Sequence, residues 1–116
     1  MNSKEMVTAI YHALDDKLAE DIKVLDIREV SVMADYFVIA NGSSQNQLNA
    51  MRREVENVMA MNGIEAKQIE GNRDSSWILM DYEDVIVHLF SKDDRLFYNL
   101  ERIWQDGKEM DVAELA

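Results

Sequence analysis

The segment WILMDYEDVIVHLF, residues 77–90, holds two apolar runs separated by Glu83 and Asp84. Two strands joined by two polar residues are typical of a tight antiparallel hairpin. We therefore predict a β-sheet that contains this hairpin, and the segments on either side must supply the other strands and the helices that cover it.

Three strands and two helices are predicted before the hairpin. Apolar residues at three- and four-residue spacing indicate helices, and short apolar runs indicate strands. Ser3 caps the first helix, and Ser44 caps the second with Gln47 at the spacing of a capping box. In chain order, the predicted elements are a helix over 3–19, a strand over 24–27, a strand over 36–40 buried on both faces, a helix over 44–61 and an edge-like strand over 64–70.

A third helix is predicted after the hairpin, over 96–104, and Gly107 ends it. Residues 106–116 are acidic and are expected to be a frayed tail. The resulting order predicts an α/β (α+β) fold, with a mixed sheet of about five strands and three helices. We expect one domain over 1–116, because nothing in the chain resembles a linker. Three helices leave one sheet face under-covered, and such apolar surfaces commonly bind partners.

The composition excludes several classes of function. The chain has no cysteine, which removes disulfides, thiol nucleophiles and thiolate metal sites. It has neither a signal-peptide pattern nor an apolar run long enough to span a membrane, so we expect a cytoplasmic protein with no membrane partner. The net charge is −11, and acidic neighbours offset each basic cluster, which disfavours direct DNA binding. A basic protein partner would be attracted, although from charge alone acidity that only maintains solubility is the favoured explanation.

The turn Gly42-Ser43-Ser44 before a helix resembles the phosphate-binding turn of nucleotidyltransferases. Those enzymes also need two carboxylates on the next strand to bind metal ions, and here that strand carries Glu70 alone. A plain helix cap is the simpler interpretation of the turn. We expect no small-molecule substrate, no cofactor and no metal.

The two histidines do not complete a catalytic set. His12 lies away from the apolar stripe of its helix and is expected at the surface, whereas His88 alternates with Ile86 and Phe90 on one strand face. A hydrogen-bonded, partly buried histidine is the favoured interpretation of His88 over a general base. The sequence therefore predicts no catalytic residues and a protein that is not an enzyme.

Several segments together resemble the ribosomal silencing factor (Iojap-like) family. The resemblance covers about residues 5 to 105, and its most specific parts are the strand from Trp77 to Tyr82 and the run Asp84-Val85-Ile86-Val87-His88. The other matching segments are Asp26-Ile27, Ala34-Asp35-Tyr36-Phe37-Val38-Ile39-Ala40, Gly42-Ser43-Ser44, Glu70-Gly71, Leu89-Phe90, Arg95, Tyr98-Asn99-Leu100-Glu101 and Trp104.

The resemblance implies a nucleotidyltransferase-like fold without the catalytic carboxylates, and a translational repressor. It implies binding to the large ribosomal subunit through its L-fourteen protein, which sterically blocks association with the small subunit. One departure stands out, because Gln45-Asn46-Gln47-Leu48 replaces the Ser-Arg-His-Val of many members and removes two potentially cationic side chains.

The under-covered sheet and the family motif together predict the partner-binding residues. These are Trp77, Leu79, Asp81 and Tyr82 from one exposed strand, with Glu70, His88 and Tyr98 nearby. Trp and Tyr favour interfaces because they combine a large apolar area with a polar group. Three alternatives remain: Trp77 and Tyr82 are ordinary core residues, the chain is a nucleotidyltransferase using Gly42, Ser43 and Glu70, or it is an acidic adaptor that forms a homodimer.

Overall fold

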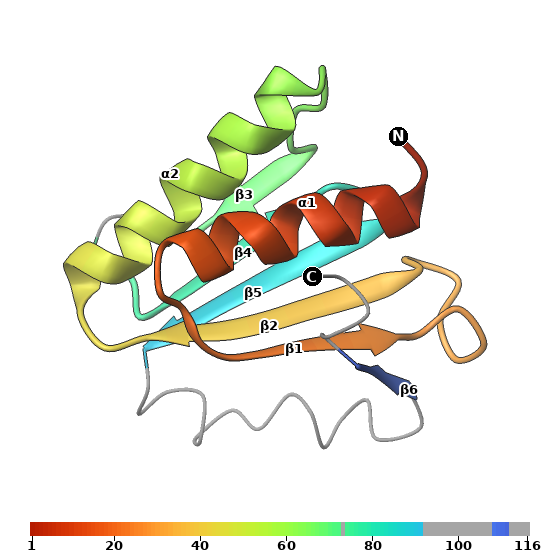
Figure 1. Cartoon of the computed structure of the whole chain (residues 1–116), viewed down its shortest axis with the longest axis horizontal. Helices are drawn as coiled ribbons and strands as arrows, with labels where there is room; N and C mark the ends of the chain where they lie inside the picture. Colours follow the sequence, from red (N-terminus) through yellow and green to blue (C-terminus); the bar gives the residue numbers. More distant parts are fainter. Residues whose placement is uncertain (73, 92–107, 112–116) are drawn as a thin grey trace.

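The computed structural model describes residues 1–72, 74–91 and 108–111. Within them, two helices pack on a six-stranded mixed sheet (Figure 1). This confirms the predicted fold class, although the sheet has six strands rather than about five. The predicted third helix over 96–104 lies outside the described residues.

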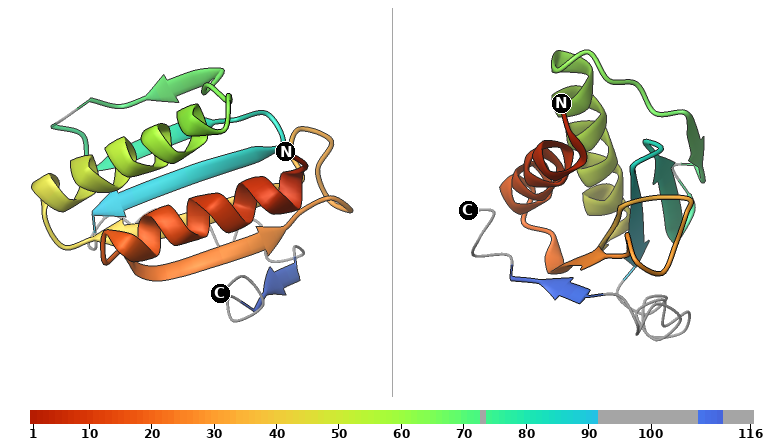
Figure 2. Two further views of the ribbon diagram at one scale, coloured as in Figure 1. Left: turned by 45° about the horizontal axis from the view of Figure 1, so that its top comes forward. Right: turned by 90° about the vertical axis from the view of Figure 1, so that its right-hand side faces the viewer.

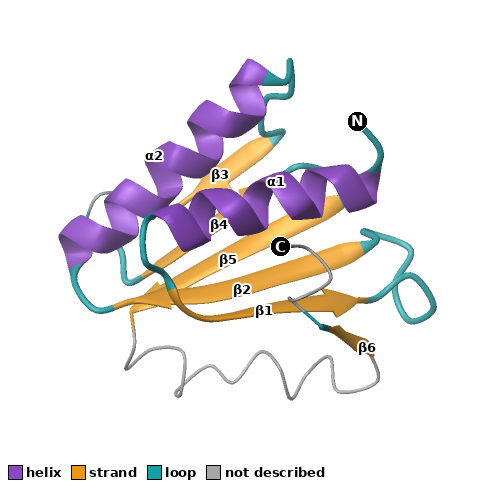
Figure 3. Ribbon diagram, in the orientation of Figure 1, coloured by secondary structure: helices purple, strands orange, loops and turns teal. Residues whose placement is uncertain are grey.

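The sheet has the order β3-β4-β5-β2-β1-β6, and among the strands described only β2 and β5 pair in parallel (Figure 3). The predicted hairpin is confirmed, because β4 and β5 pair antiparallel with Trp77 opposite Phe90. Its turn includes Glu83 with a φ of 68°. The strands are β1 (Glu20–Asp26), β2 (Tyr36–Gly42), β3 (Gln68–Glu70), β4 (Trp77–Asp81), β5 (Val85–Ser91) and β6 (Lys108–Met110).

The central strand β2 is buried along its whole length, as its unbroken apolar run predicts. It pairs with β5 on one side and β1 on the other. Its side chains alternate between the two faces of the sheet, so that Val38 and Ala40 join the core under the helices while Phe37 and Ile39 join a second apolar cluster. The sheet therefore has apolar side chains on both faces.

Helices α1 (Ser3–Asp16) and α2 (Gln45–Met61) both lie on one face of the sheet (Figure 2). The N-cap of α1 is Asn2 rather than the predicted Ser3, because Asn2 and Glu5 form a reciprocal capping box. The helix ends at Asp16, before the predicted 19, because Leu18 has a φ of 60° and is 79% exposed. Ser44 caps α2 as predicted.

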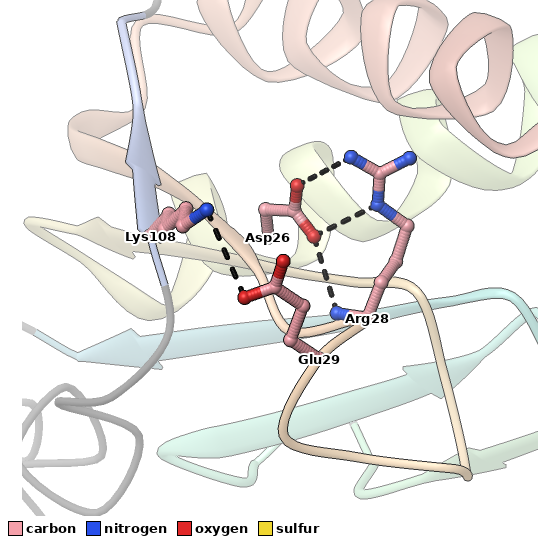
Figure 4. Close-up of polar contacts among 4 residues, drawn as sticks. All are labelled: Asp26, Arg28, Glu29 and Lys108. Atoms are coloured by element: carbon pink, nitrogen blue, oxygen red, sulfur yellow. Dashed lines mark hydrogen bonds and ion pairs between the residues drawn. The ribbon is translucent and has the colours of Figure 1, made fainter.

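The prediction of a frayed tail over 106–116 is wrong for Lys108–Met110, which form β6. These residues pair antiparallel with β1, so their backbone N–H and C=O groups have hydrogen-bond partners. The acidic composition of the segment does not predict this pairing. A salt bridge of 3.7 Å also links Lys108 to Glu29 in the loop between β1 and β2 (Figure 4). Residues 106, 107 and 112–116 lie outside the described part of the chain.

The start of the β1–β2 loop is fixed by Arg28, whose guanidinium donates two hydrogen bonds to Asp26 (Figure 4). The same guanidinium lies 5.4 Å from the ring centroid of Tyr36. The hydrogen bond from the Arg28 side chain lowers the pKa of Asp26, against a smaller opposing effect of burial. The loop then continues to two highly exposed apolar residues, Val32 and Met33.

Candidate functional site

The face of the sheet that points away from α1 and α2, here called the distal face, carries the side chains of the candidate site. Strand β4 divides its residues strictly between the two faces. Ile78 and Met80 are fully buried in the core under the helices, whereas Trp77, Leu79 and Asp81 are half-buried on the distal face. Three of the predicted partner-binding residues therefore share one surface.

Four rings cluster on this face, from three neighbouring strands. Trp77 stacks on Phe90 with centroids 5.3 Å apart, and Phe37 meets His88 edge-on at 5.0 Å. Trp77 and His88 are 6.0 Å apart, and the indole Nε1–H donates a hydrogen bond of 3.2 Å to Nδ1 of His88. The cluster holds Trp77 in one orientation while leaving part of its surface accessible to solvent.

His88 is 5% exposed and hydrogen-bonded, which confirms the interpretation preferred from the sequence. Because Nδ1 accepts from Trp77, a neutral imidazole carries its proton on Nε2. Burial lowers the pKa of His88 to about 4, so the neutral form persists at physiological pH. The buried Nε2 has no hydrogen-bond partner in the described part of the chain. These features describe an orienting residue for Trp77 and do not suit a general base at neutral pH.

The two acidic residues of the predicted site also lie toward the distal face. Asp81 follows the alternation of Trp77 and Leu79, and its Oδ1 accepts a hydrogen bond of 2.8 Å from the backbone N–H of Glu83 in the hairpin turn. Glu70 pairs in register with Leu79 and accepts a hydrogen bond of 2.7 Å from Gln68. The site therefore joins an apolar centre to an acidic margin.

Tyr82 does not belong to this surface, so its placement on one exposed strand with Trp77 is wrong. It follows the last residue of β4, is 5% exposed and packs in the core cluster under the helices. The strict alternation of a strand explains this, because Tyr82 is on the same face as Ile78 and Met80. Burial raises the pKa of its hydroxyl to about 12, with a smaller contribution from the charge of Glu56. Tyr98 lies outside the described residues.

Ile86 also belongs to the distal face, although the sequence does not predict it as a partner-binding residue. Ile86 is half-buried, packs against the second apolar cluster and stands opposite Asp81 in the ladder. Its alternation with His88 indicates that the two side chains share one face of β5. The apolar run of β5 is unbroken, however, so the sequence does not indicate which face of this strand remains accessible to solvent.

The proposed nucleotidyltransferase residues do not come together. Strands β4 and β5 separate Glu70 on β3 from Gly42 at the end of β2, and three strand spacings amount to about 14 Å. In addition, Gln47 Oε1 accepts hydrogen bonds from both the backbone N–H and the hydroxyl of Ser43, so these donors are already used within the turn. No cluster of three or more His, Asp or Glu side chains suited to a metal occurs among the described residues. None of the helices described is long and apolar enough to cross a bilayer.

Comparisons with known proteins identify the family of this chain. The family model described as "Ribosomal silencing factor during starvation" matches residues 1–116. The chain belongs to the ribosomal silencing factor family. A relative from Bacillus subtilis, named ribosomal silencing factor RsfS, is 44% identical over 112 residues, which cover 97% of this chain and 95% of the relative.

Two solved structures resemble the fold of this family member. A crystal structure of a Bacillus halodurans protein has a TM-score of 0.82 at 37% identity, covering 92% of this chain and 97% of that one. A crystal structure of a Chromobacterium violaceum protein has a TM-score of 0.86 at 28% identity, covering 96% of this chain and 92% of that one. The resemblance inferred from the sequence is confirmed.

Two glutamines at the start of α2 have a structural role in this silencing-factor family member. Gln47 Nε2 donates hydrogen bonds to the backbone oxygens of Lys17 and Leu18, at 3.2 and 2.8 Å, and so ties α2 to the end of α1. Gln45 Nε2 donates to the backbone oxygen of Ser75, in the segment before β4, at 2.7 Å. Two neutral amides thus connect three parts of the fold.

Proposed function

We propose that this protein is a translational repressor that binds the large ribosomal subunit in the cytoplasm through the subunit's L-fourteen protein. The bound factor then occupies the surface that the small subunit needs, so the two subunits do not join. This mode of action requires binding at a shared surface and no catalysis. Membership of the ribosomal silencing factor family supports it.

The observation that carries the proposal is the half-exposed apolar group on the distal face. Trp77, Leu79 and Ile86 come from two paired strands and are not fully buried, whereas Ile78 and Met80 on the opposite face are. A tryptophan that a neighbouring hydrogen bond already orients loses little conformational freedom when a partner covers it. Such residues typically contribute most of the energy of a protein interface.

The charge of the protein supports a basic partner. The net charge is −11, and Asp81 and Glu70 stand at the margin of the apolar group. Acidic residues at the rim of an interface increase the association rate with a cationic protein, and the same charges repel the phosphates of ribosomal RNA. We therefore expect the association rate to fall as salt concentration rises.

Sedimentation of purified ribosomal subunits tests the proposal. The factor is expected to co-sediment with large subunits, and small subunits added afterwards should form fewer complete ribosomes. A photo-crosslinking amino acid at Leu79 should label the L-fourteen protein, whereas the same amino acid at the exposed Met61 of α2 should not. Failure to co-sediment at micromolar concentration would refute subunit binding, and crosslinks from Leu79 to other proteins alone would refute the proposed partner.

A further inference from the structure

We propose that the free edge of β3 and the groove beside it form a second docking site, for an extended segment that alternates basic and apolar side chains. The site lies mainly on the helix side of the sheet, away from the distal face used in the proposed function. Of the residues assigned to the distal face, the docking site uses Glu70, which stands at the margin of that face.

The backbone of β3 is one component of this site. β3 is the outermost strand of the sheet beside β4, and no strand in the described ranges lies beyond it. An edge strand presents N–H and C=O groups to which an incoming chain can add as a further strand. Because β3 has only three residues, backbone pairing would supply few hydrogen bonds, and side-chain contacts must add to them.

The groove supplies these side-chain contacts. It runs between the C-terminal part of α2 and β3, and its apolar lining comes from Ala60, Ile64, Ala66, Ile69 and Tyr82. The buried ring of Tyr82 belongs to the core, whereas Ile64, Ala66 and Ile69 are only partly covered. An apolar side chain of a partner would remove the remaining apolar surface from water.

The charges around the groove favour a basic occupant. Glu56 and Glu65 line it, and Glu70 follows Ile69 on β3. Glu56 is paired with Arg52 at 3.0 Å, but neither Glu65 nor Glu70 has a salt bridge to a described residue. A second copy of the chain would place its own carboxylates against these, so like-charge repulsion disfavours pairing of β3 with β3.

The register of β3 specifies the pattern of the occupant. Ile69 stands opposite the buried Met80 and faces the helix side, whereas Gln68 and Glu70 stand opposite Asp81 and Leu79 of the distal face. Side chains directly opposite each other on paired strands share a face. The matching strand therefore places an apolar residue opposite Ile69 and a Lys or Arg opposite Glu70.

A synthetic peptide with the sequence Lys-Val-Lys-Ile-Arg-Val-Lys, blocked at both ends, tests this inference with the full-length protein. We expect saturable binding, with amide chemical-shift changes concentrated over residues 64–70. Ile69→Lys should weaken binding at least tenfold, because a cation then occupies the groove beside a cationic peptide. Glu109→Lys, on the edge strand β6 at the other end of the sheet, is the matched control and should leave binding within twofold.

Two further peptides separate strand addition from simple charge attraction. A peptide N-methylated at its apolar residues keeps its charge but loses backbone donors, and it should bind at least tenfold more weakly. A peptide with Glu in place of Lys and Arg should not bind. Equal binding of the N-methylated peptide, an unchanged affinity of the Ile69→Lys variant, or shifts centred on Trp77 and Ile86 would overturn the proposal.

The outcome does not depend on that of the ribosome experiment. Ile69→Lys should leave co-sedimentation with large subunits unchanged, because Ile69 faces away from the distal face. If the wild-type protein is a dimer that Ile69→Lys dissociates in sedimentation velocity runs, the groove binds a second copy and the inference is wrong.

Discussion

Trp77 and His88 stand on adjacent antiparallel strands and share one hydrogen bond, in which the indole Nε1–H donates to Nδ1 of the imidazole at 3.2 Å. The two residues are eleven positions apart in the chain, and the hairpin brings them together. The buried partner thus fixes the direction of the half-exposed one. This relationship links the packing of the sheet to the surface proposed to bind the ribosome.

Trp77→Ala should weaken binding to the large subunit by about 1 to 4 kcal/mol if Trp77 is an interface anchor. Trp77→Phe retains an aromatic ring but loses the Nε1–H, so it should have an intermediate effect. The measurement is a titration of labelled protein with large subunits at fixed ionic strength.

Met61→Ala is the control for this series, because Met61 is a large apolar residue that is 79% exposed at the end of α2. It should leave subunit binding unchanged. Denaturant unfolding of each variant separates lost binding from lost folding. If Trp77→Ala folds normally and binds as tightly as wild type, the distal face is not the interface.

The free energy of unfolding should fall in acid partly because of His88. Burial lowers the pKa of His88 to about 4, below the value near 6.5 expected in the unfolded chain. As pH falls, the imidazole of His88 therefore binds a proton at a higher pH in the unfolded chain than in the folded protein. The contribution of neutral His88 is complete above about pH 6.5 and is lost as pH decreases toward 4, by about 3 kcal/mol in total.

Comparison with His88→Gln isolates this contribution, since the carboxylates titrate similarly in both proteins. The difference in free energy of unfolding between wild type and variant should diminish between pH 6.5 and 4. Tryptophan fluorescence should change in wild type over the lower part of this range, because protonated Nδ1 no longer accepts from Trp77. Stability curves that stay parallel over this interval would contradict the assignment.

Most of the sheet could be predicted from the sequence because its signals are local. The hairpin has its turn and both strands within fifteen consecutive residues, 77–91, and the apolar run of β2 indicates burial on both faces. Ser44 marks the start of α2 in the same way. In each case neighbouring residues alone determine the element.

The sequence predictions fail where the structure of a segment depends on residues far away in the chain. Lys108–Met110 form a strand by pairing with the edge of β1, which lies 82 to 86 residues earlier in the chain. The aromatic chemistry of Tyr82 predicts an interface residue beside Trp77, but strand alternation places it in the helix-side core. The roles of Gln45 and Gln47 could not be predicted either, because the carbonyls that they bind belong to other segments.

Gly71→Ala should destabilise the fold by more than about 2 kcal/mol. Gly71 has a φ of 105°, and a Cβ there would lie 2.8 Å from the backbone oxygen of Trp77. Gly63 is the matched control, because its φ is 75° and a Cβ would have no atom within 4 Å. Gly63→Ala should therefore cost only the left-handed backbone strain, about 1 kcal/mol. Urea unfolding compares the two, and equal losses would refute the role of the close contact.

Gln47→Ala should lower the free energy of unfolding by about 1 kcal/mol or more, because it removes an acceptor from Ser43 and a donor from the carbonyls of Lys17 and Leu18. Asn57→Ala, at an exposed position in the same helix, should change stability by less than about 0.5 kcal/mol.

Gln47→Glu separates the two functions of the amide. A carboxylate still accepts from Ser43 but cannot donate to the two carbonyl oxygens, and its charge is repelled by them. If the link between α1 and α2 is what matters, Gln47→Glu should be at least as unstable as Gln47→Ala in urea unfolding. If Gln47→Glu is as stable as wild type, the hydrogen bonds from Ser43 alone account for the stability lost in Gln47→Ala. In that case neither helix depends on the hydrogen bonds from Gln47 to the carbonyls of Lys17 and Leu18.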